Sequence, residues 1–199
     1  MAVILVAEVG GLRAVKVVFM LEDKRLIWKL KAGDAGALRQ IYQNYKDGLL
    51  TIAILLLGER AAAEDILYDV FVSFAGQTGR FRLYGSLKNY FVSCVVERVR
   101  QKFRSKMYEV VGLESTGPIV AETERPDEPI VGAEQSQMLT EALGRLGRQQ
   151  REVIVLHLQG GMKFSQIADM QGVSISTVQS RYRYGLDKLQ STLNGKVIQ

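Results

Sequence analysis

The chain has 199 residues, of which 47% are hydrophobic and 24% are charged. That composition is typical of a soluble globular protein with one large domain or two small ones, and it excludes a compositionally disordered chain. The formal net charge of +5 and the sequence pI of about 9.3 fit a polyanionic partner without requiring one.

Residues 1–20 are apolar and rich in β-branched side chains, with interruptions at Glu8, Arg13 and Lys16. They have no basic start and no small-residue cleavage site, so they make a poor signal peptide and are interpreted as an uncertain N-terminal extension. A regular helical pattern begins near Met20, which leaves open that translation starts there. No stretch approaches the roughly 20 uninterrupted apolar residues that span a bilayer.

Four helices are predicted in the N-terminal half, at residues 21–31, 34–57, 60–76 and 86–104, because apolar residues recur there at helical spacing. Asp34 and Ser86 each follow a glycine and are well placed to cap the helices that they precede. The second helix carries a broad apolar stripe, which predicts a helical bundle.

A basic stretch ends this bundle. Between Arg80 and Lys106, eight basic residues accompany a single acid, Glu97. Cationic side chains with interleaved rings suit a separated nucleic-acid strand, because phosphates bind the cations and bases stack on the rings. The alternative is a solvated basic face over an aromatic core. The interleaved aromatic residues are Phe81, Tyr84, Tyr90 and Phe103.

Composition and charge change between residues 107 and 136. This segment contains all three prolines of the chain and most of its acidic residues beyond Lys106, and it has little periodicity. It is predicted to be an acidic flexible linker. A second helical module follows at 137–195, so the predicted fold is all-α, with two small helical domains joined by the linker.

Residues 164–183, FSQIADMQGVSISTVQSRYR, contain two short apolar clusters separated by Gly172. They predict two crossing helices, in which Ala168 is the small inner residue, Gly172 tolerates a positive φ in the turn, and Val178 packs back. Ile175 and Tyr182 complete the apolar face of the second helix. The pattern predicts a helix-turn-helix, and the alternative is a structural hairpin that never touches DNA.

The outward positions of the second helix carry side chains that hydrogen-bond base edges and phosphates. Arg181 and Gln179 are the strongest candidates for base edges, and Arg183 is a candidate for a phosphate. The predicted DNA-binding set of this recognition helix is Ser174, Ser176, Thr177, Gln179, Ser180, Arg181 and Arg183.

Nothing in the sequence predicts catalysis, a cofactor or a metal. Cys94 is the single cysteine, which excludes an intramolecular disulfide and favours a reduced, cytoplasmic compartment. His157 has no Cys or second His nearby and is interpreted as a packed helix residue. Asp65 and Asp69 flank Tyr68 on one helical face, which suits a protein partner or a solvated surface, and nothing nearby completes a catalytic set.

Together these patterns resemble the extracytoplasmic-function (ECF) group of the sigma-70 family of bacterial RNA polymerase initiation factors. The C-terminal likeness covers ALGRLGRQQREVIVLHLQGGMKFSQIADMQGVSISTVQSRYRYGLDKL, including the QREV run and the TV-x-SR recognition helix. The N-terminal likeness covers about residues 22–106 and includes AAAEDILYDVFVSF and GSLKNYFVSCVVERVRQKFRS.

The resemblance implies a region 2-like domain at 21–106 that binds core polymerase and the minus-10 element. It also implies a winged-helix-like, region 4 helix-turn-helix domain at 137–195 that binds the minus-35 element. The implied partners are core RNA polymerase, promoter DNA and an anti-sigma factor, without membrane insertion. The implied core contacts are Asp65, Tyr68, Asp69 and Ser73, and the implied promoter-melting contacts are Arg80, Arg82, Lys88, Asn89, Arg98 and Lys102.

The chain departs from the family pattern at four positions. Tyr68 replaces a glutamine, Gly147 replaces a proline, and Glu97 and Gln101 replace the asparagine and aspartate often found in the melting helix. These departures bear on promoter melting more than on core binding. A stand-alone helix-turn-helix regulator that does not engage polymerase, and a helical adaptor or enzyme with an incidental basic face, stay as alternatives.

Overall fold

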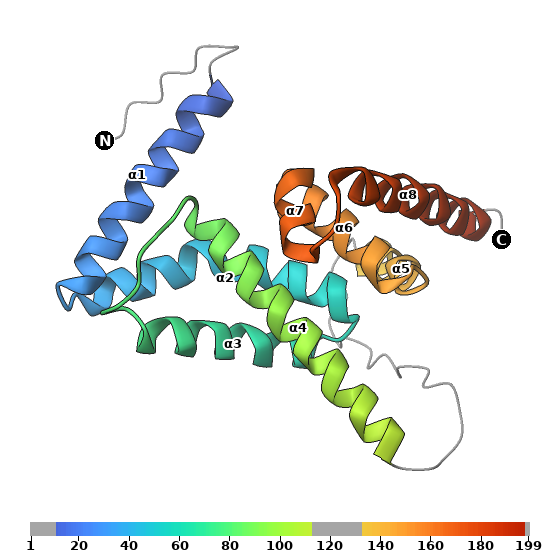
Figure 1. Ribbon diagram of the computed structural model, residues 1–199, viewed down its shortest axis with the longest axis horizontal. Coiled ribbons are helices and arrows are strands. Elements are labelled where there is room, and N and C mark those ends of the chain that lie inside the picture. The colour runs from blue at the N-terminus through green and yellow to red at the C-terminus, as the bar shows by residue number, and fades with distance from the viewer. Residues whose placement is uncertain (1–10, 113–132, 198–199) are drawn as a thin grey trace.

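The computed structural model describes the backbone of residues 11–112 and 133–197, and the side chains of residues 21–105 and 137–194. Every element in these ranges is an α-helix, so the all-α prediction is confirmed, and no β wing accompanies the helix-turn-helix there (Figure 1). The helices are α1 (Gly11–Lys31), α2 (Ala35–Leu57), α3 (Arg60–Gly76), α4 (Leu87–Gly112), α5 (Ala133–Gly144), α6 (Arg148–Leu158), α7 (Phe164–Gln171) and α8 (Ile175–Val197).

Helix α2 begins and ends where its sequence predicts. Asp34 precedes it, and its Oδ1 accepts a hydrogen bond of 2.8 Å from the backbone N–H of Gly36. Gly58 follows it in the left-handed region at φ +82°, and its N–H donates to the carbonyl of Ile54. A side-chain cap and a glycine cap satisfy backbone groups that helix ends leave without intrahelical partners, so the capping prediction for Asp34 is confirmed.

Two predicted boundaries are wrong. Helix α1 begins at Gly11 instead of residue 21, and α4 continues to Gly112, into the segment predicted to be linker. β-Branched residues lower helix propensity only slightly, and extending an existing helix is easier than nucleating a new one. The predicted linker is also too long at its other end, because α5 begins at Ala133, and residues 113–132 lie outside the described residues.

A buried polar pair ties α1, α2 and α4 together. The Tyr45 hydroxyl donates a hydrogen bond of 2.5 Å to Oδ1 of Asp23, a residue that is only 4% exposed. The Asp23 carboxylate also accepts from the backbone N–H of Leu87, the first residue of α4. Burial raises the pKa of Asp23 and, together with the hydrogen bond to Asp23, raises the pKa of Tyr45. Asp23 of α1 therefore gives the first N–H of α4 a hydrogen-bond partner, and Tyr45 of α2 holds the Asp23 carboxylate.

In the C-terminal part, α5 and α7 pack against α8, and α6 and α8 approach each other closely at Gly185. A Cβ at Gly185 would lie 2.8 Å from Cδ1 of Ile154 and 3.3 Å from Cβ of Gln150, so the absence of a side chain permits this approach. Two leucines of this part lie outside its core: Leu139 and Leu158 are exposed, and Leu158 is the last residue of α6.

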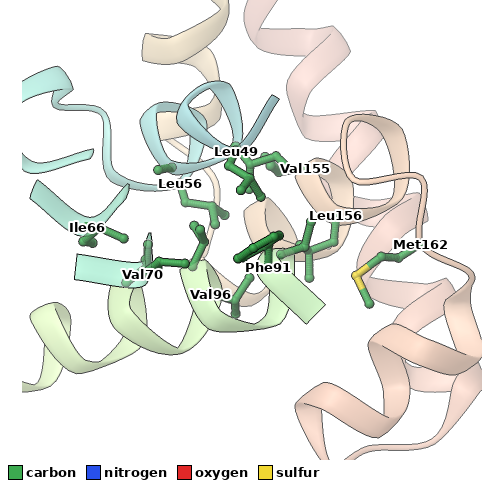
Figure 2. Packing of buried hydrophobic residues seen from close by; sticks show 14 of the residues in the cluster. Leu49, Leu56, Ile66, Val70, Phe91, Val96, Val155, Leu156 and Met162 are labelled. Carbon is green, nitrogen blue, oxygen red and sulfur yellow. The ribbon is translucent and has the colours of Figure 1, made fainter. Parts of the chain in front are cut away.

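The two helical parts share one apolar core. Leu49 and Leu56 of α2 and Phe91 of α4 lie beside Val155 and Leu156 of α6 (Figure 2). All five side chains belong to one contiguous cluster of buried hydrophobic residues. The sequence predicts two domains held by a tether, whereas the structure packs the C-terminal helices directly against α2 (Figure 1).

None of the described helices combines the length and the apolar character that crossing a membrane requires.

We expect the free energy of unfolding to fall as the pH rises above about 10. Burial raises the pKa of Tyr45 well above its usual range and the pKa of Tyr90 to about 12. The unfolded chain then releases tyrosine protons at a pH where the folded chain still holds them, so rising pH favours the unfolded state. Urea unfolding at a series of pH values from about 9 to about 11 measures this effect.

Tyr45→Phe tests the assignment, because it removes one of the two hydroxyls, those of Tyr45 and Tyr90, whose pKa burial raises. Its stability at neutral pH should be lower by about 1–3 kcal/mol, since the buried Asp23 carboxylate loses a donor. Its decline with pH should be shallower than that of the wild type. The same decline in both proteins would contradict the assignment.

Candidate nucleic-acid interface

Helices α7 and α8 form the predicted helix-turn-helix. Gly172 ends α7 in the left-handed region at φ +65°, and its N–H donates to carbonyls in the last turn of that helix. Ile167, Ala168 and Val178 are buried where the two helices meet. The predicted roles of Ala168, Gly172 and Val178 in the helix crossing are confirmed.

Ser174 holds the first turn of α8. Its Oγ accepts a hydrogen bond of 3.1 Å from the backbone N–H of Thr177 and lies 2.8 Å from the hydroxyls of Ser176 and of Thr177. Its backbone carbonyl accepts from the N–H of Val178. This is the geometry of an N-cap, so the predicted DNA-contacting Ser174 also has a structural role.

The other predicted DNA contacts differ in how far they are exposed. Ser176, Gln179 and Arg183 are exposed, whereas Thr177, Ser180 and Arg181 are half-buried. Ile175 was expected on the packed face, but it is 48% exposed. It lies one turn before Gln179 and two turns before Arg183, so these three side chains share a face of α8. Sequence periodicity did not predict the exposure of Ile175, because an apolar side chain at helical spacing is expected to be buried.

Arg181 is held by a chain of side-chain contacts. Its Nη1 donates to Oε1 of Gln171 at 2.6 Å, and Nε2 of Gln171 donates to Oε1 of Glu152 at 2.9 Å. Glu152 is only 6% exposed and is paired with Arg100 of α4. The contacts therefore run from the N-terminal part, through α6 and α7, to the recognition helix.

The basic residues between Arg80 and Arg104, whose side chains the structure describes, do not form one surface. Arg98 donates to Asp69 at 3.1 Å and to Ser73 at 2.8 Å, both on α3. Lys88 lies near the C-terminal part, because its Nζ would be 3.7 Å from a Cβ added at Gly161. Arg80, Arg82 and Lys102 are exposed, the first two in the segment before α4, and Asn89 is half-buried in the first turn of α4.

Most of the interleaved aromatic rings are engaged within the protein. Phe81 packs against Phe74 and Tyr90, with ring centroids 5.2 and 4.8 Å apart. The Arg148 guanidinium lies over the Phe103 ring, 5.0 Å from its centroid. Tyr84 is 82% exposed, so its ring is accessible for stacking. The expectation of a packed aromatic core therefore describes Phe81 and Tyr90 better than base stacking does.

The residues expected to contact core polymerase share one face of α3. Asp65, Tyr68 and Asp69 are exposed, and Ser73 is half-buried beside Arg98. Tyr68 is 70% exposed and borders a groove of about 750 Å³ between α2 and α3. Apolar side chains contribute most of the groove, including Leu38, Tyr42, Leu50, Leu67, Phe71 and Val72.

His157 and Cys94 are packed within the protein. The His157 ring stacks on Phe164 with centroids 4.3 Å apart, and its Nδ1 lies 2.9 Å from the carbonyl of Met162. Burial raises the pKa of the Cys94 thiol. Within residues 21–105 and 137–194 there is no group of three or more side chains that could hold a metal ion.

Comparison with known proteins places the helix-turn-helix in a family. Residues 136–189 match the protein-family model of sigma-70, region 4. The chain is 24% identical over 179 residues to the ECF RNA polymerase sigma factor SigW of Bacillus subtilis, covering 85% of this chain and 96% of SigW. It is 26% identical over 163 residues to the ECF RNA polymerase sigma factor BldN of Streptomyces coelicolor, covering 78% and 61%.

Solved structures share the fold. The sigma factor RpoE, in its complex with the anti-sigma factor NepR from Bartonella quintana, is 24% identical with a TM-score of 0.61, covering 78% of this chain and 96% of RpoE. CnrH, in complex with the cytosolic domain of CnrY, is 19% identical with a TM-score of 0.62, covering 87% and 98%.

Ser174→Ala should lower the free energy of unfolding by about 1 kcal/mol, because α8 loses its N-cap. Thermal or urea unfolding measures the change. Ser176→Ala is the matched control, since it removes a hydroxyl two residues further along that accepts no described backbone N–H. Equal stability of the two variants would show that the Ser174 hydroxyl does not stabilise the helix end.

Proposed function

We propose that the chain is a non-enzymatic sigma factor of the ECF group of the sigma-70 family, that it directs transcription initiation, and that its surfaces divide this work. Helix α8 reads duplex promoter DNA, the exposed face of α3 binds core RNA polymerase, and the segment around Tyr84 contacts the separated strand. The observation that carries the proposal is the helix-turn-helix, whose α8 presents polar side chains to solvent within the segment that matches region 4.

Promoter reading follows from the side chains of α8 when that helix lies in the major groove. Arg181 and Gln179 contact base edges, while Ser176, Thr177 and Ser180 contact bases or phosphates and Arg183 contacts a phosphate. The structure adds Ile175, because an exposed apolar side chain on the same face can contact the methyl group of thymine. Ser174 both caps the helix and lies at its DNA-facing end.

Core polymerase binds the exposed face of α3. Tyr68 supplies a large aromatic surface, Asp65 and Asp69 supply charge, and the adjoining groove accepts an apolar side of the partner. Interfaces are enriched in tyrosine near their centre, and charged residues at the rim set orientation and encounter rate. Arg98 holds Asp69 and Ser73 from α4, so it positions part of this surface.

The separated promoter strand contacts fewer residues than the sequence suggests. Arg80, Arg82 and Tyr84 are exposed together in the segment between α3 and α4, where phosphates and a base can reach them. Lys102 adds charge along α4. Arg98 and Phe103, in contrast, already have partners within the protein.

An anti-sigma factor and a cytoplasmic location complete the proposal. RpoE and CnrH, which share the fold, are described in complexes with NepR and with the cytosolic domain of CnrY. By analogy, a protein inhibitor holds this chain in the cytoplasm until it is released. The rival function is a helix-turn-helix regulator that binds DNA without polymerase.

Transcription in vitro tests the proposal. Purified protein and sigma-free bacterial core polymerase should give discrete transcript starts that share an upstream motif. Arg181→Ala should relax the sequence preference by about 1–3 kcal/mol, because a bidentate arginine contact is lost. Arg183→Ala is the matched control and should weaken binding evenly across sequences. Salt-sensitive DNA binding without any transcript starts would instead favour the stand-alone regulator.

Tyr68→Ala should weaken core polymerase binding about tenfold, because a large aromatic side chain at the centre of an interface is a typical hot spot. Pull-down or fluorescence titration with core polymerase measures the affinity. Tyr84→Ala removes an even more exposed tyrosine outside α3, and it should leave the affinity for core unchanged. If the two variants bind core equally well, the α3 face is not the polymerase surface.

A further inference from the structure

Gln171 bridges two side chains of opposite charge. Its Oε1 accepts a hydrogen bond of 2.6 Å from Nη1 of Arg181, and its Nε2 donates one of 2.9 Å to Oε1 of Glu152. Gln171 is the last residue of α7, whereas Arg181 belongs to α8 and Glu152 to α6. The bridge therefore joins three helices of the C-terminal part, and one of them is the recognition helix.

The chemistry of its two neighbours fixes the orientation of the Gln171 amide. A guanidinium only donates hydrogen bonds, and a carboxylate only accepts them. The amide oxygen must therefore face Arg181 and the amide nitrogen must face Glu152, because the reverse orientation would lose both bonds. Gln171 thus holds Nη1 of Arg181 at one defined place.

The Glu152 side chain has little freedom to move away from Gln171. The residue is only 6% exposed. Its two carboxylate oxygens also accept hydrogen bonds from Nη2 and Nε of Arg100, at 2.5 and 3.2 Å. A buried carboxylate that is bonded at both oxygens can shift only by leaving a buried charge without partners. Glu152 therefore gives Gln171 a fixed acceptor.

The bridge leaves one edge of the Arg181 guanidinium available to a ligand. Among the described residues, Nη1 has a hydrogen-bond partner, whereas Nε and Nη2, which share the other edge, have none. Arg181 also lines a cleft of about 800 Å³ together with Gln149 and Gln171. Two N–H groups on one edge of a guanidinium are what a bidentate contact to a base requires.

Holding Arg181 before DNA arrives changes what the arginine can recognise. A long, unrestrained side chain loses rotamer freedom when it binds, and it can turn toward a phosphate as well as toward a base. A side chain that is already held loses less freedom on binding, and it fits best the base edge that lies opposite its available N–H groups. The bridge therefore favours one base over the others.

We propose that Gln171, held by Glu152, is a positioning residue that sets the sequence preference of Arg181 in promoter recognition. The inference rests on the proposed function, because it takes Arg181 to contact a base edge. It adds that this preference depends on a residue outside the recognition helix. Gln171 acts through Arg181 and contacts no base itself.

Gln171→Met tests the proposal in the full chain, with Gln149→Met as the matched control. Methionine keeps the length and the helix propensity of glutamine but has no amide, so both bonds of the bridge are lost. Gln149 lines the same cleft, and its side chain has no hydrogen-bond partner among the described residues. Gln149→Met therefore makes the same chemical change without breaking the bridge.

The readout is binding to duplexes that carry each possible base pair at every position of the upstream motif obtained from the mapped transcript starts. The position where Arg181→Ala loses its preference is the one that Arg181 reads. There, Gln171→Met should reduce the preference for the best base pair about fivefold. Preferences at other positions and the salt dependence should not change, because no phosphate contact is removed. Gln149→Met should match the wild type throughout.

A double variant separates positioning from direct contact. In the Arg181→Ala background, Gln171→Met should change the base preferences no further, because Gln171 acts only through Arg181. Gln171→Asn keeps the amide on a side chain that is one methylene shorter, so it cannot reach both partners and should relax the same position. Circular dichroism verifies folding, and Gln171→Asn decides the outcome if Gln171→Met does not fold.

Three results would overturn the inference. Gln171→Met could keep the wild-type preference at the Arg181 position, it could weaken binding to all duplexes equally, or it could lose preference further in the Arg181→Ala background, which would make Gln171 a direct contact. Failure of the proposed function gives a different result, because the wild type would then select no motif or Arg181→Ala would lose preference at no position.

Discussion

Helix α2 is apolar around most of its circumference in its second half, and no single neighbour can cover it. Ile52, Ala53 and Leu56 are buried, and Ile54, Leu55 and Leu57 are partly buried against the same core. A helix that is hydrophobic on all sides must be surrounded by other elements. Helices α3 and α4 cover it from the N-terminal part, and α5 and α6 cover it from the C-terminal part (Figure 1). The packing of the described helices around α2 follows from this requirement.

Apolar burial drives the two parts together but does not fix how they meet, because the hydrophobic effect has no direction. Arg100 and Arg151 supply the direction. Each ends on a specific carbonyl at the end of a helix in the other part, and Arg100 also pairs with a buried carboxylate. Arg151 is half-buried, and its burial lowers the pKa of its guanidinium, while its Nε has no hydrogen-bond partner among the described residues. Arg151 therefore helps to fix how the two parts meet, but it leaves one buried N–H group without a hydrogen-bond partner.

Local patterns in the sequence predict the helices and the helix-turn-helix correctly, because both depend on neighbouring residues. Asp34 caps α2 and Gly172 turns the chain between α7 and α8, and each can be recognised without knowing the rest of the fold. Ile175 could not be predicted in the same way. Its exposure depends on where the neighbouring helices end, and periodicity does not carry that information. The docking of the two parts was missed for the same reason.

The arginines of α4 illustrate why a candidate surface cannot be counted from charge alone. Arg98, Arg100 and Arg104 occupy one short stretch, yet the first pairs with α3, the second with α6 and α7, and the third with Glu97 of its own helix. Successive positions on a helix point in different directions, so the basic side chains of one run contact different neighbouring elements. Much of its positive charge is therefore used to hold the fold together. Under the proposed function, cationic surface for a separated strand comes from the exposed Arg80, Arg82, Lys88 and Lys102, whereas Arg98, Arg100 and Arg104 are already paired within the protein.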